Sequence, residues 1–395
     1  MKPKILVLTT SFPRWENDTN GVFVLDFVKS ISTFYEVHII APFFVGALKE
    51  EIISDIHIHR FVQFPFKKVS LAYGDDIMTK LKNNKLMGFV VPFFILSFLL
   101  KALKVIKKEK ISLLHAFWLI PQGFIAVIIK KIFFRKLKII VSILGADING
   151  FNNKAGRFIQ LKTLNELDLL IGQSKPMIEK AKKIGYEGLS VFLPLGIDTN
   201  SYKPMPYKNN FDFNNPELLF VATLSLRKGI SYLIEAISIV KKQVPNVKLK
   251  VIGNGDQMNA MKLLTKELDI VDNVEFLGFK SPADLNFYFS SCDLFVLPSL
   301  SEGFPLVVIS ALSSGAVTLV SDLPVFRELK EENNNLLTLF EVKNSDDLSN
   351  QILKILKDYS NYSLHTIENR DYIINHFDNN QLAIKYKNLI LSLNN

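Results

Sequence analysis

The stretch Cys292-Asp-Leu-Phe-Val-Leu-Pro298-Ser-Leu-Ser-Glu302-Gly-Phe-Pro305-Leu-Val-Val-Ile-Ser310 contains the most informative pattern in the chain. Its apolar first part predicts a buried parallel strand that ends at Pro298. A polar turn with one carboxylate, Glu302, follows. Pro305 can then open a helix, because a proline in the first helical turn costs no hydrogen bond. The unpaired amides of such a helix start attract anions, so the stretch suits a ligand that carries both hydroxyl and phosphate groups.

Short apolar segments and amphipathic segments alternate along the rest of the chain, which predicts an α/β fold with helices on both faces of parallel sheets. We expect strands at 4–10, 37–41, 56–62, 113–116, 138–142, 169–172, 190–192, 218–222, 248–252, 274–277, 294–297 and 317–320, and helices at 23–34, 86–108, 123–134, 158–167, 176–183, 230–243, 257–268, 284–290, 309–314, 348–358 and 381–391. At 395 residues the chain exceeds what one core usually holds. The aperiodic segment 195–216 therefore divides it into two doubly wound domains. Ligands of such sheets bind beyond the carboxyl ends of the strands, so the cleft between the two domains is the expected site.

Positive charge is concentrated in the first half. Residues 1–200 contain 28 basic and 16 acidic residues, a net charge of +12, whereas residues 201–395 contain 19 and 22, a net charge of −3. The lysine clusters at 101–110 and 130–136 are mixed with bulky apolar residues, which favours an anionic membrane surface over nucleic acid. Ordinary solvated helix faces are the alternative. The run 86–100 is shorter than the roughly 20 residues that span a bilayer, so we expect a buried or interface-lying helix there.

Two further features concern the compartment. The first apolar segment, 4–10, is short and predicts a strand rather than a secretory signal. Cys292 is the single cysteine and falls in a predicted buried strand, which fits a reducing cytosol. We therefore expect a cytoplasmic protein, or one that is peripheral on the inner face of the cell membrane.

Four loops at expected strand ends carry residues that could bind a ligand. Gly21 precedes a helix and lets the backbone approach a phosphate closely. Asp147, in Gly145-Ala-Asp147, could bind a hydroxyl or could equally cap a helix. Arg227 and Lys228 precede a helix and could hold a diphosphate, although a surface pair is the plain alternative. The fourth loop is the opening stretch, with Gly253-Asn-Gly255 as its neighbour; no glycine stands at Met258, so the dinucleotide fingerprint is incomplete.

No cluster of metal ligands is apparent. The six histidines are scattered, and His57-Ile-His59 lies on a strand-like segment where we expect no carboxylate support. Asp75-Asp76 is isolated in an expected loop, and no Asp-x-Asp stands at a strand end. We therefore expect neither a metal nor a cofactor.

Taken together, these motifs resemble the family 4 retaining glycosyltransferases of the GT-B fold, over nearly the whole chain. The matching pieces are, in order, Ser11-Phe-Pro, Gly21-Val-Phe-Val, His115-Ala-Phe-Trp118-Leu-Ile-Pro121-Gln-Gly123, Leu144-Gly145-Ala-Asp147, Ser174, Pro194-Leu-Gly196-Ile-Asp198, Lys228-Gly229, Gly253-Asn-Gly255, Leu277-Gly278 and Glu302-Gly303-Phe304-Pro305. The resemblance implies two Rossmann-like domains that face each other across a cleft. They are a basic acceptor-binding domain at 1–200 and a nucleotide-sugar-binding domain at 201–375, with a C-terminal helix at 376–395 that packs back toward the first.

The activity that the resemblance implies is metal-independent transfer of a sugar from a nucleotide sugar, UDP- or GDP-linked, to a glycan or lipid-linked acceptor in surface polysaccharide or glycoconjugate synthesis. Lys228 would contact the donor diphosphate, and Glu302 would hold hydroxyls of the donor sugar. The implied catalytic residues are Lys228, Glu302 and Asp147, and the implied donor-binding residues are Gly21, Arg227, Gly253, Phe279, Gly303, Phe304, Leu306 and Ser310. No nucleic acid partner is expected.

The chain departs from the family pattern in three of its motifs. Ser310 stands where the family has a second glutamate, which binds the nucleotide ribose, and Leu144 stands where it has a histidine. Ala222-Thr223 replaces a frequent Gly-Arg, so that Arg227 would have to supply the second cation. A catalytically inactive GT-B protein that binds a partner enzyme or glycan is therefore the alternative, and other GT-B chemistry such as sugar-nucleotide epimerisation is a third possibility.

Overall fold

The computed structural model describes residues 2–16, 18–65, 71–73, 80, 84–150, 153–205 and 211–393. The expected loop at Asp75-Asp76 lies outside these residues. The chain divides into two compact units, one formed by Met1–Gly196 with Leu382–Asn395 and the other by Ile197–Gln381. The first unit ends four residues before the expected boundary at 200, and the second continues past 375. Much of the terminal helix α16 (Asn379–Ser392) therefore belongs to the first unit.

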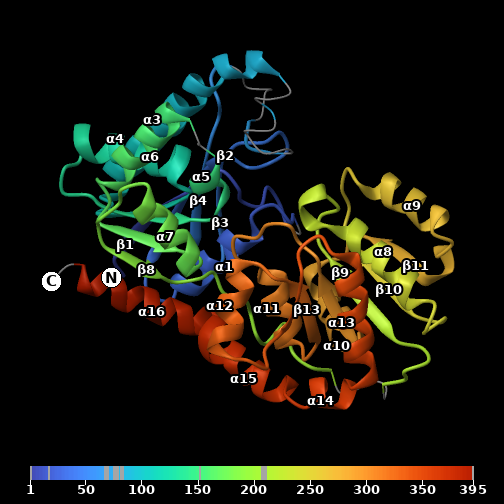
Figure 1. The fold of residues 1–395 in the computed structure, drawn as a ribbon. Coiled ribbons are helices and arrows are strands. Elements are labelled where there is room, and N and C mark those ends of the chain that lie inside the picture. The colour runs from blue at the N-terminus through green and yellow to red at the C-terminus, as the bar shows by residue number, and fades with distance from the viewer. Residues whose placement is uncertain are drawn as a thin grey trace. The chain divides into compact units, whose positions relative to one another are not determined.

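The first unit contains an eight-stranded sheet in the order β3-β4-β2-β1-β5-β6-β7-β8. Figure 1 labels β1, β2, β3, β4 and β8 of this sheet. Its strands are β1 (Lys4–Leu8), β2 (Glu36–Pro42), β3 (Glu50–Ile53), β4 (Ile56–Phe61), β5 (Leu113–Phe117), β6 (Lys138–Ile143), β7 (Leu169–Gly172) and β8 (Ser190–Phe192). All neighbouring pairs are parallel except β3 with β4, which is antiparallel. The sequence did not predict β3, because its Glu-Glu-Ile-Ile pattern lacks an apolar run.

Helices cover both faces of this sheet. They are α1 (Val22–Ile31), α3 (Val91–Glu109), α4 (Phe124–Ile132), α5 (Ala146–Asn149), α6 (Lys154–Leu164), α7 (Lys175–Lys183) and α16, with short helical turns at η1 (Lys85–Phe89) and η2 (Leu119–Gly123). Leu6 and Leu8 of β1 share a core with Phe94 and Phe98 of α3. Successive side chains of a strand point to opposite faces, so Ile5 and Val7 are buried on the other face.

The helix expected at 86–108 is η1 followed by α3. By length and composition alone, the helical stretch Leu86–Glu109 could cross a membrane, and 22% of its most apolar window is buried in the protein. It is thus longer than the apolar run 86–100 on which the sequence-based expectation rested.

The second unit contains a six-stranded parallel sheet in the order β11-β10-β9-β12-β13-β14. Its strands are β9 (Glu217–Val221), β10 (Lys248–Ile252), β11 (Val274–Gly278), β12 (Leu294–Leu297), β13 (Val317–Ser321) and β14 (Thr338–Phe340). Its helices are α8 (Ile230–Val240), α9 (Met258–Glu267), α10 (Pro282–Ser291), α11 (Leu306–Ser313), α12 (Pro324–Glu332), α13 (Ser345–Lys357), α14 (Tyr359–Ser363) and α15 (Thr366–Phe377), with turns at η3 (Leu226–Lys228) and η4 (Val271–Asn273). The sequence did not predict α12, β14, α14 or α15.

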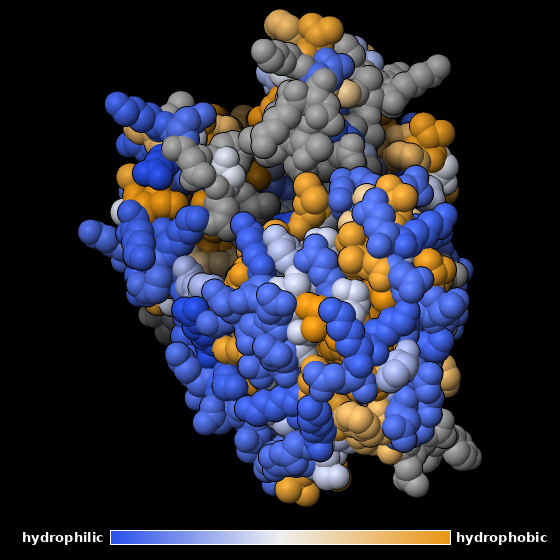
Figure 2. Space-filling view, turned by 45° about the vertical axis from the view of Figure 1, so that its right-hand side comes forward, coloured by the Kyte–Doolittle hydropathy of each residue, from blue (hydrophilic) through white to orange (hydrophobic). Residues whose placement is uncertain are grey.

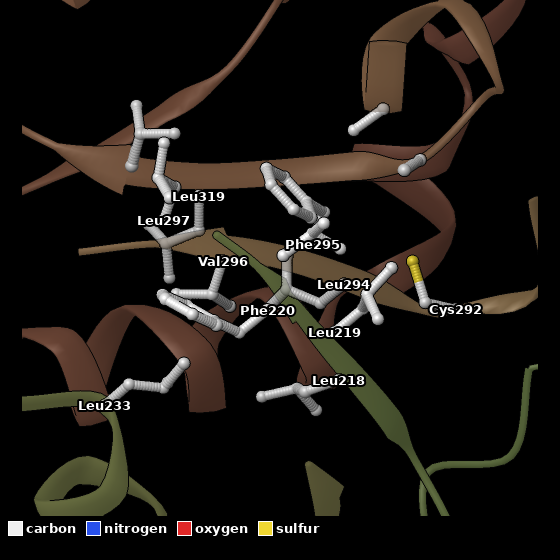
Figure 3. Close-up of a cluster of buried hydrophobic side chains, with 14 of the residues drawn as sticks. Leu218, Leu219, Phe220, Leu233, Cys292, Leu294, Phe295, Val296, Leu297 and Leu319 are labelled. Carbon is white, nitrogen blue, oxygen red and sulfur yellow. The ribbon is translucent and has the colours of Figure 1, made fainter. Parts of the chain in front are cut away.

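Large apolar side chains of the central strands fill the core of this unit. Figure 3 shows Phe220 of β9 beside Val296 of β12, with Leu233 of α8 beneath them, and all three are fully buried. Outside, hydrophilic side chains predominate on the face seen in Figure 2, and hydrophobic ones form small separate patches, as on most folded proteins.

Candidate functional site

The point where the strand order of the second sheet reverses brings the main predicted residues together. Going outward from β9, the chain first runs through β10 and β11 and then returns to the other side of β9 as β12. This is the Rossmann order, in which ligands bind at the carboxyl ends of the two central strands. The loop after β9 carries Arg227 and Lys228, and the loop after β12 carries Glu302. Their proximity therefore follows from topology.

Glu302 is held by two donors from these two loops. Its Oε1 accepts a hydrogen bond from Lys228 Nζ at 2.5 Å and another from Ser299 Oγ at 2.5 Å. The side chain of Glu302 is 6% exposed and that of Lys228 is 13% exposed, so the ion pair is shielded from water. Its other oxygen, Oε2, lies 3.8 Å from Arg227 Nη1. Among the described residues, no donor is within hydrogen-bonding distance of Oε2, which can therefore accept from a ligand.

Backbone contacts lock the two loops against each other. Leu300 N donates to Arg227 O at 2.8 Å, and Arg227 Nη1 donates to Ser301 O at 3.2 Å. Gly229 ends the turn η3 with a φ of 64°, and a Cβ there would lie 2.0 Å from Pro298 O. Only glycine fits this close approach in the left-handed region. The positions of Lys228 and Glu302 are thus fixed by the loops as well as by their own ion pair.

Helix α11 begins at Leu306, four residues after Glu302. Pro305 caps the helix, and Val308 N donates to Pro305 O at 3.0 Å. As at any helix start, the amides of Leu306 and the following residue have no intrahelical acceptor, so they can bind an anion together with Lys228. Phe304 packs against Phe377 with ring centroids 5.6 Å apart. Ser310, one turn into α11, is buried with 5% of its surface exposed.

The loops after β10 and β11 lie next to these, at the carboxyl ends of the neighbouring strands. Gly253 N donates to Gly278 O at 2.8 Å. A Cβ on Gly253 would lie 1.9 Å from Ala222 O, so the loop after β10 packs directly on the loop after β9. Phe279, next along, is 55% exposed and presents an open ring at this edge. The structure therefore brings Gly253, Phe279, Lys228 and Glu302 to the carboxyl ends of adjacent strands in one sheet.

Gly21 lies in the first unit, where it precedes α1. Its φ is 69°, and a Cβ there would lie 2.3 Å from Ser11 O, so glycine is required for the chain to turn into the helix. Asp18 braces the same loop through two side-chain bonds to Arg14. The amide of Gly21 is thus held on a rigid loop at the carboxyl end of β1, and its contact with a phosphate stays a prediction.

Asp147 is buried and bound to backbone amides. Its carboxylate is 3% exposed and accepts hydrogen bonds from the amides of Leu119, Leu144 and Gly145, at 2.8, 3.1 and 2.9 Å. Burial raises the pKa of the carboxyl group, and the backbone hydrogen bonds oppose that shift. The carboxylate oxygens thus join two backbone turns, as in the capping alternative, and a contact of Asp147 with substrate stays a prediction.

The histidines of β2 and β4 are not scattered, and the expectation that His57-Ile-His59 lacks carboxylates is wrong. His59 Nδ1 contacts Glu50 of β3, and His38 Nε2 lies 3.2 Å from Glu36 Oε1. Glu36 lies on β2, the same strand as His38, and Glu50 lies on β3, a strand that the sequence did not predict. The sequence analysis also did not predict Ser299 as a site residue. The only sequence signal for it is its position three residues before Glu302.

Comparison with solved structures identifies the class of fold. The chain has a TM-score of 0.82 to sucrose-phosphate synthase from Thermosynechococcus elongatus, at 17% identity over 99% of both chains. Its TM-score to HepE of Anabaena in complex with UDP is 0.73, at 18% identity over 98% of this chain and 100% of that one. The protein thus has the two-domain GT-B fold. Residues 203–374, within the second unit, match the family Glycosyl transferases group 1.

Curated relatives match part of the chain. One is an uncharacterized glycosyltransferase of Haemophilus influenzae, 33% identical over 132 residues, which are 33% of this chain and 37% of that protein. Another is the O-antigen biosynthesis glycosyltransferase WclY of Escherichia coli, 28% identical over 204 residues, which are 50% of this chain and 54% of that protein. The chain therefore spans between about a third and about a half of the length of these two relatives.

Proposed function

We propose that this protein is a retaining, metal-independent glycosyltransferase that moves a sugar from a nucleotide-sugar donor to a glycan or lipid-linked acceptor. The observation that carries the proposal is the shielded pair of Lys228 and Glu302 at the reversal point of the second sheet. It combines a cation for a phosphate with a carboxylate for hydroxyls, the two groups that a nucleotide sugar presents.

The proposed chemistry follows from the charges at this point. Cleavage of the bond between sugar and diphosphate adds a second negative charge to the terminal phosphate of the nucleoside diphosphate, and groups that meet this charge as it develops lower the barrier. Lys228, Arg227 and the first amides of α11 are the groups available. They supply positive charge and hydrogen-bond donors, the role that a divalent cation fills in other enzymes. Glu302 would accept sugar hydroxyls through Oε2, while Ser299 keeps its other oxygen in place.

The donor that we infer is a UDP- or GDP-sugar, with UDP favoured. HepE, which shares the fold, was crystallised with UDP and with UDP-glucose. We propose an acceptor in surface polysaccharide or glycoconjugate synthesis because WclY is named for O-antigen biosynthesis.

An assay of nucleotide release tests this function. The purified protein is incubated with UDP- and GDP-sugars and with extracted lipid-linked glycans, and free nucleotide is measured. Proton NMR of the first product then reports the anomeric configuration. Turnover that requires acceptor, persists in excess chelator and gives a product of retained configuration supports the proposal. Inversion or a strict requirement for added divalent cation contradicts it.

Ser310 favours a second candidate, an inactive protein that binds a glycan or partner enzyme. A buried serine cannot supply the charged contact that the family's glutamate makes with ribose, and such a contact contributes about 1.5–3 kcal/mol. Loss of donor affinity altogether, in a protein that still folds, would support this second function over the first.

The helical stretch Leu86–Glu109 supports a further part of the proposal, peripheral attachment to an anionic membrane. Large apolar side chains recur every three or four residues along one face and are 41–73% exposed; they are Leu86, Phe89, Phe93, Leu96 and Leu100. Lys104 and Lys107 continue this face and are exposed. An exposed apolar face with lysines at its end suits the boundary between acyl chains and anionic headgroups.

Vesicle co-sedimentation tests this attachment. The protein should bind vesicles of phosphatidylglycerol and phosphatidylcholine at low salt, and the double variant Phe89→Ser/Phe93→Ser should bind at least tenfold less. The matched control is Phe287→Ser, which removes an aromatic ring exposed to 55% in the second unit. Vesicle binding that changes neither with salt nor with Phe89→Ser/Phe93→Ser would exclude this surface as the membrane attachment site.

A further inference from the structure

A cluster of histidines and glutamates lies on one face of β2, β3 and β4 in the first unit. His38 pairs with His57 in the parallel register of β2 and β4, and Glu50 pairs with His59 in the antiparallel register of β3 and β4. Paired residues point to the same side of a sheet, so these four side chains share a face with Glu36. Strands covered by helices are normally apolar on both faces, and this cluster therefore needs an explanation.

Helix α3 completes a hollow of about 660 Å³ over the cluster, lined by both strand and helix residues. Further along the same face the packing becomes apolar, where Phe61 of β4 stacks on Phe98 of α3 at 4.5 Å. The polar residues thus occupy the amino ends of β2 and β4. The loop that carries Gly21 follows the carboxyl end of β1, which is the opposite end of the parallel strands of this sheet.

The cluster has three polar contacts but only two hydrogens to fill them. Three contacts form a chain: Glu36 Oε1 with His38 Nε2 at 3.2 Å, His38 Nδ1 with His59 Nε2 at 3.1 Å, and His59 Nδ1 with Glu50 Oε2. Each contact needs one hydrogen or one cation between its two atoms, but two neutral imidazoles supply only two N–H groups. Lys4 binds Glu36 Oε1 at 2.9 Å, yet no bond from Lys4 to His38 is present in the described part of the chain. One of the three contacts therefore has neither a hydrogen nor a cation between its two atoms.

The donor atoms that face each other decide which cation fits. His38 is 2% exposed, so its ring nitrogens meet protein groups rather than solvent. If His59 donates to Glu50 and His38 donates to His59, the Nε2 lone pair of His38 points at Glu36. A neutral imidazole nitrogen beside a carboxylate is a pair of ligands that first-row transition metals prefer.

We propose that this cluster binds one divalent transition metal ion, with Zn²⁺ as the ion that it fits best, through His38, His57 and Glu36. One ligand atom from each of the three residues lies within 4.8 Å of the other two. Donor atoms around tetrahedral zinc are about 3.4 Å apart, so a small side-chain movement closes the site. His59 and Glu50 orient His38, as hydrogen-bonded carboxylates do for the histidines of zinc sites.

The bound ion would act as a clamp between strands. It would join β2 to β4 at the amino ends of these strands, and none of the proposed sugar-transfer residues lies on either strand. This inference is therefore independent of the proposed function, and a metal at this place agrees with metal-independent transfer.

Titration with Zn²⁺, and with Co²⁺ as a coloured probe, tests the proposal on the full chain. We expect one ion per chain, visible ligand-field absorption of bound Co²⁺, and a higher melting temperature with Zn²⁺ but not with Mg²⁺. His57→Ala and Glu36→Gln should each weaken binding at least about tenfold, and His59→Gln about 10- to 100-fold through misorientation of His38. Glu36→Gln keeps the size of the side chain and serves if His57→Ala fails to fold.

The matched control is His376→Ala, which removes an exposed histidine of the second unit and should leave Zn²⁺ affinity unchanged. Absence of stoichiometric binding, or binding that His57→Ala and Glu36→Gln leave intact, would overturn the proposal. Equal loss of binding in His376→Ala would also overturn it, because the ion would then lie on unrelated surface histidines.

Discussion

Lys228 Nζ and Glu302 Oε1 lie 2.5 Å apart, although the two residues are separated by 74 positions in the sequence. Neighbouring parallel strands β9 and β12 explain the contact, because each residue follows the carboxyl end of one of them. The pair is a preformed polar centre rather than a surface ion pair, since both side chains are largely shielded. Exposed pairs contribute little, whereas a shielded and hydrogen-bonded pair can orient a ligand.

Replacement of Lys228 by alanine should lower kcat/KM for sugar transfer by about 100- to 1,000-fold, the usual effect of losing one group that stabilises the charge of a transition state. Lys228→Arg should retain part of the activity, because it keeps the positive charge. Steady-state kinetics with the best donor measure both. Lys241→Ala, which removes a partly exposed lysine of the same unit, is the matched control and should match the wild type. Full activity in Lys228→Ala would exclude a role in transfer.

Ser299 should act through Glu302 and not on the substrate. It is fully buried, and its hydroxyl donates to Glu302 Oε1. Ser299→Ala should reduce kcat at least about tenfold, because a hydrogen bond to a charged group contributes about 1.5–3 kcal/mol. Ser299→Thr should restore most of the activity because the hydroxyl returns. A Ser299→Thr variant as poor as Ser299→Ala would indicate a packing role instead.

Gly229→Ala should disrupt the proposed donor site without unfolding the first unit. A Cβ would lie 2.0 Å from Pro298 O, and the φ of 64° is unfavourable for alanine. The loop must shift, at a cost of about 1–3 kcal/mol. Donor affinity, measured by calorimetry, should fall at least tenfold. The outcome against this account is an unchanged affinity together with an unchanged melting temperature.

Tyr386 should anchor helix α16 to the first sheet. Its hydroxyl lies 2.9 Å from His115 Nδ1, and His115 Nε2 lies 2.8 Å from Ser142 Oγ. Tyr386→Phe leaves a buried imidazole nitrogen unpaired, so unfolding free energy should fall by about 1–3 kcal/mol. Both tryptophans of the chain, Trp15 and Trp118, are in the first unit, so urea unfolding followed by their fluorescence reports on it. Tyr372→Phe in the second unit is the control, and an equal effect there would refute the specific role of Tyr386.

The stability of the first unit should decrease in acid through His115. Burial lowers the pKa of His115 to about 3, whereas a histidine in an unfolded chain titrates near 6.5. Between these values the unfolded chain holds a proton that the folded chain lacks, so His115 removes about 1.4 kcal/mol of stability per pH unit as the pH falls from about 6.5 toward 3. Urea unfolding at pH 7, 6 and 5 should show a shallower pH dependence for His115→Gln than for the wild type. Identical slopes would contradict the burial of a neutral ring.

The sequence predicted the main features of the second unit. The apolar run 294–297 and the following turn match β12 and its loop, and the glycine patterns mark where adjacent loops touch. The resemblance assigned both Lys228 and Glu302 to donor binding. Their contact then followed from the strand order, which places β9 beside β12. Helices α12 and α15 escaped prediction because their short amphipathic patterns are interrupted by polar residues, and tertiary packing of Phe326 and Phe377 decides them.

Two parts of the first unit could not be predicted from local pattern. The role of Asp147 depends on the amide of Leu119, which is 28 residues away, so spacing alone could not separate a ligand-binding carboxylate from a structural one. The histidine cluster depends on the pairing of β2, β3 and β4, and β3 has too short an apolar signal to be recognised. In both cases the decisive partner lies on another strand or turn.

Calorimetric titration with UDP-glucose and with GDP- and ADP-sugars shows whether the pair of Lys228 and Glu302 binds a nucleotide-sugar donor. We expect that one of these donors binds the wild type at one site per chain, that Lys228→Ala and Glu302→Gln each weaken binding at least about tenfold, and that Lys241→Ala binds as the wild type does. A folded wild-type protein with no affinity for any of these donors, or donor binding that both site variants leave intact, would contradict this expectation.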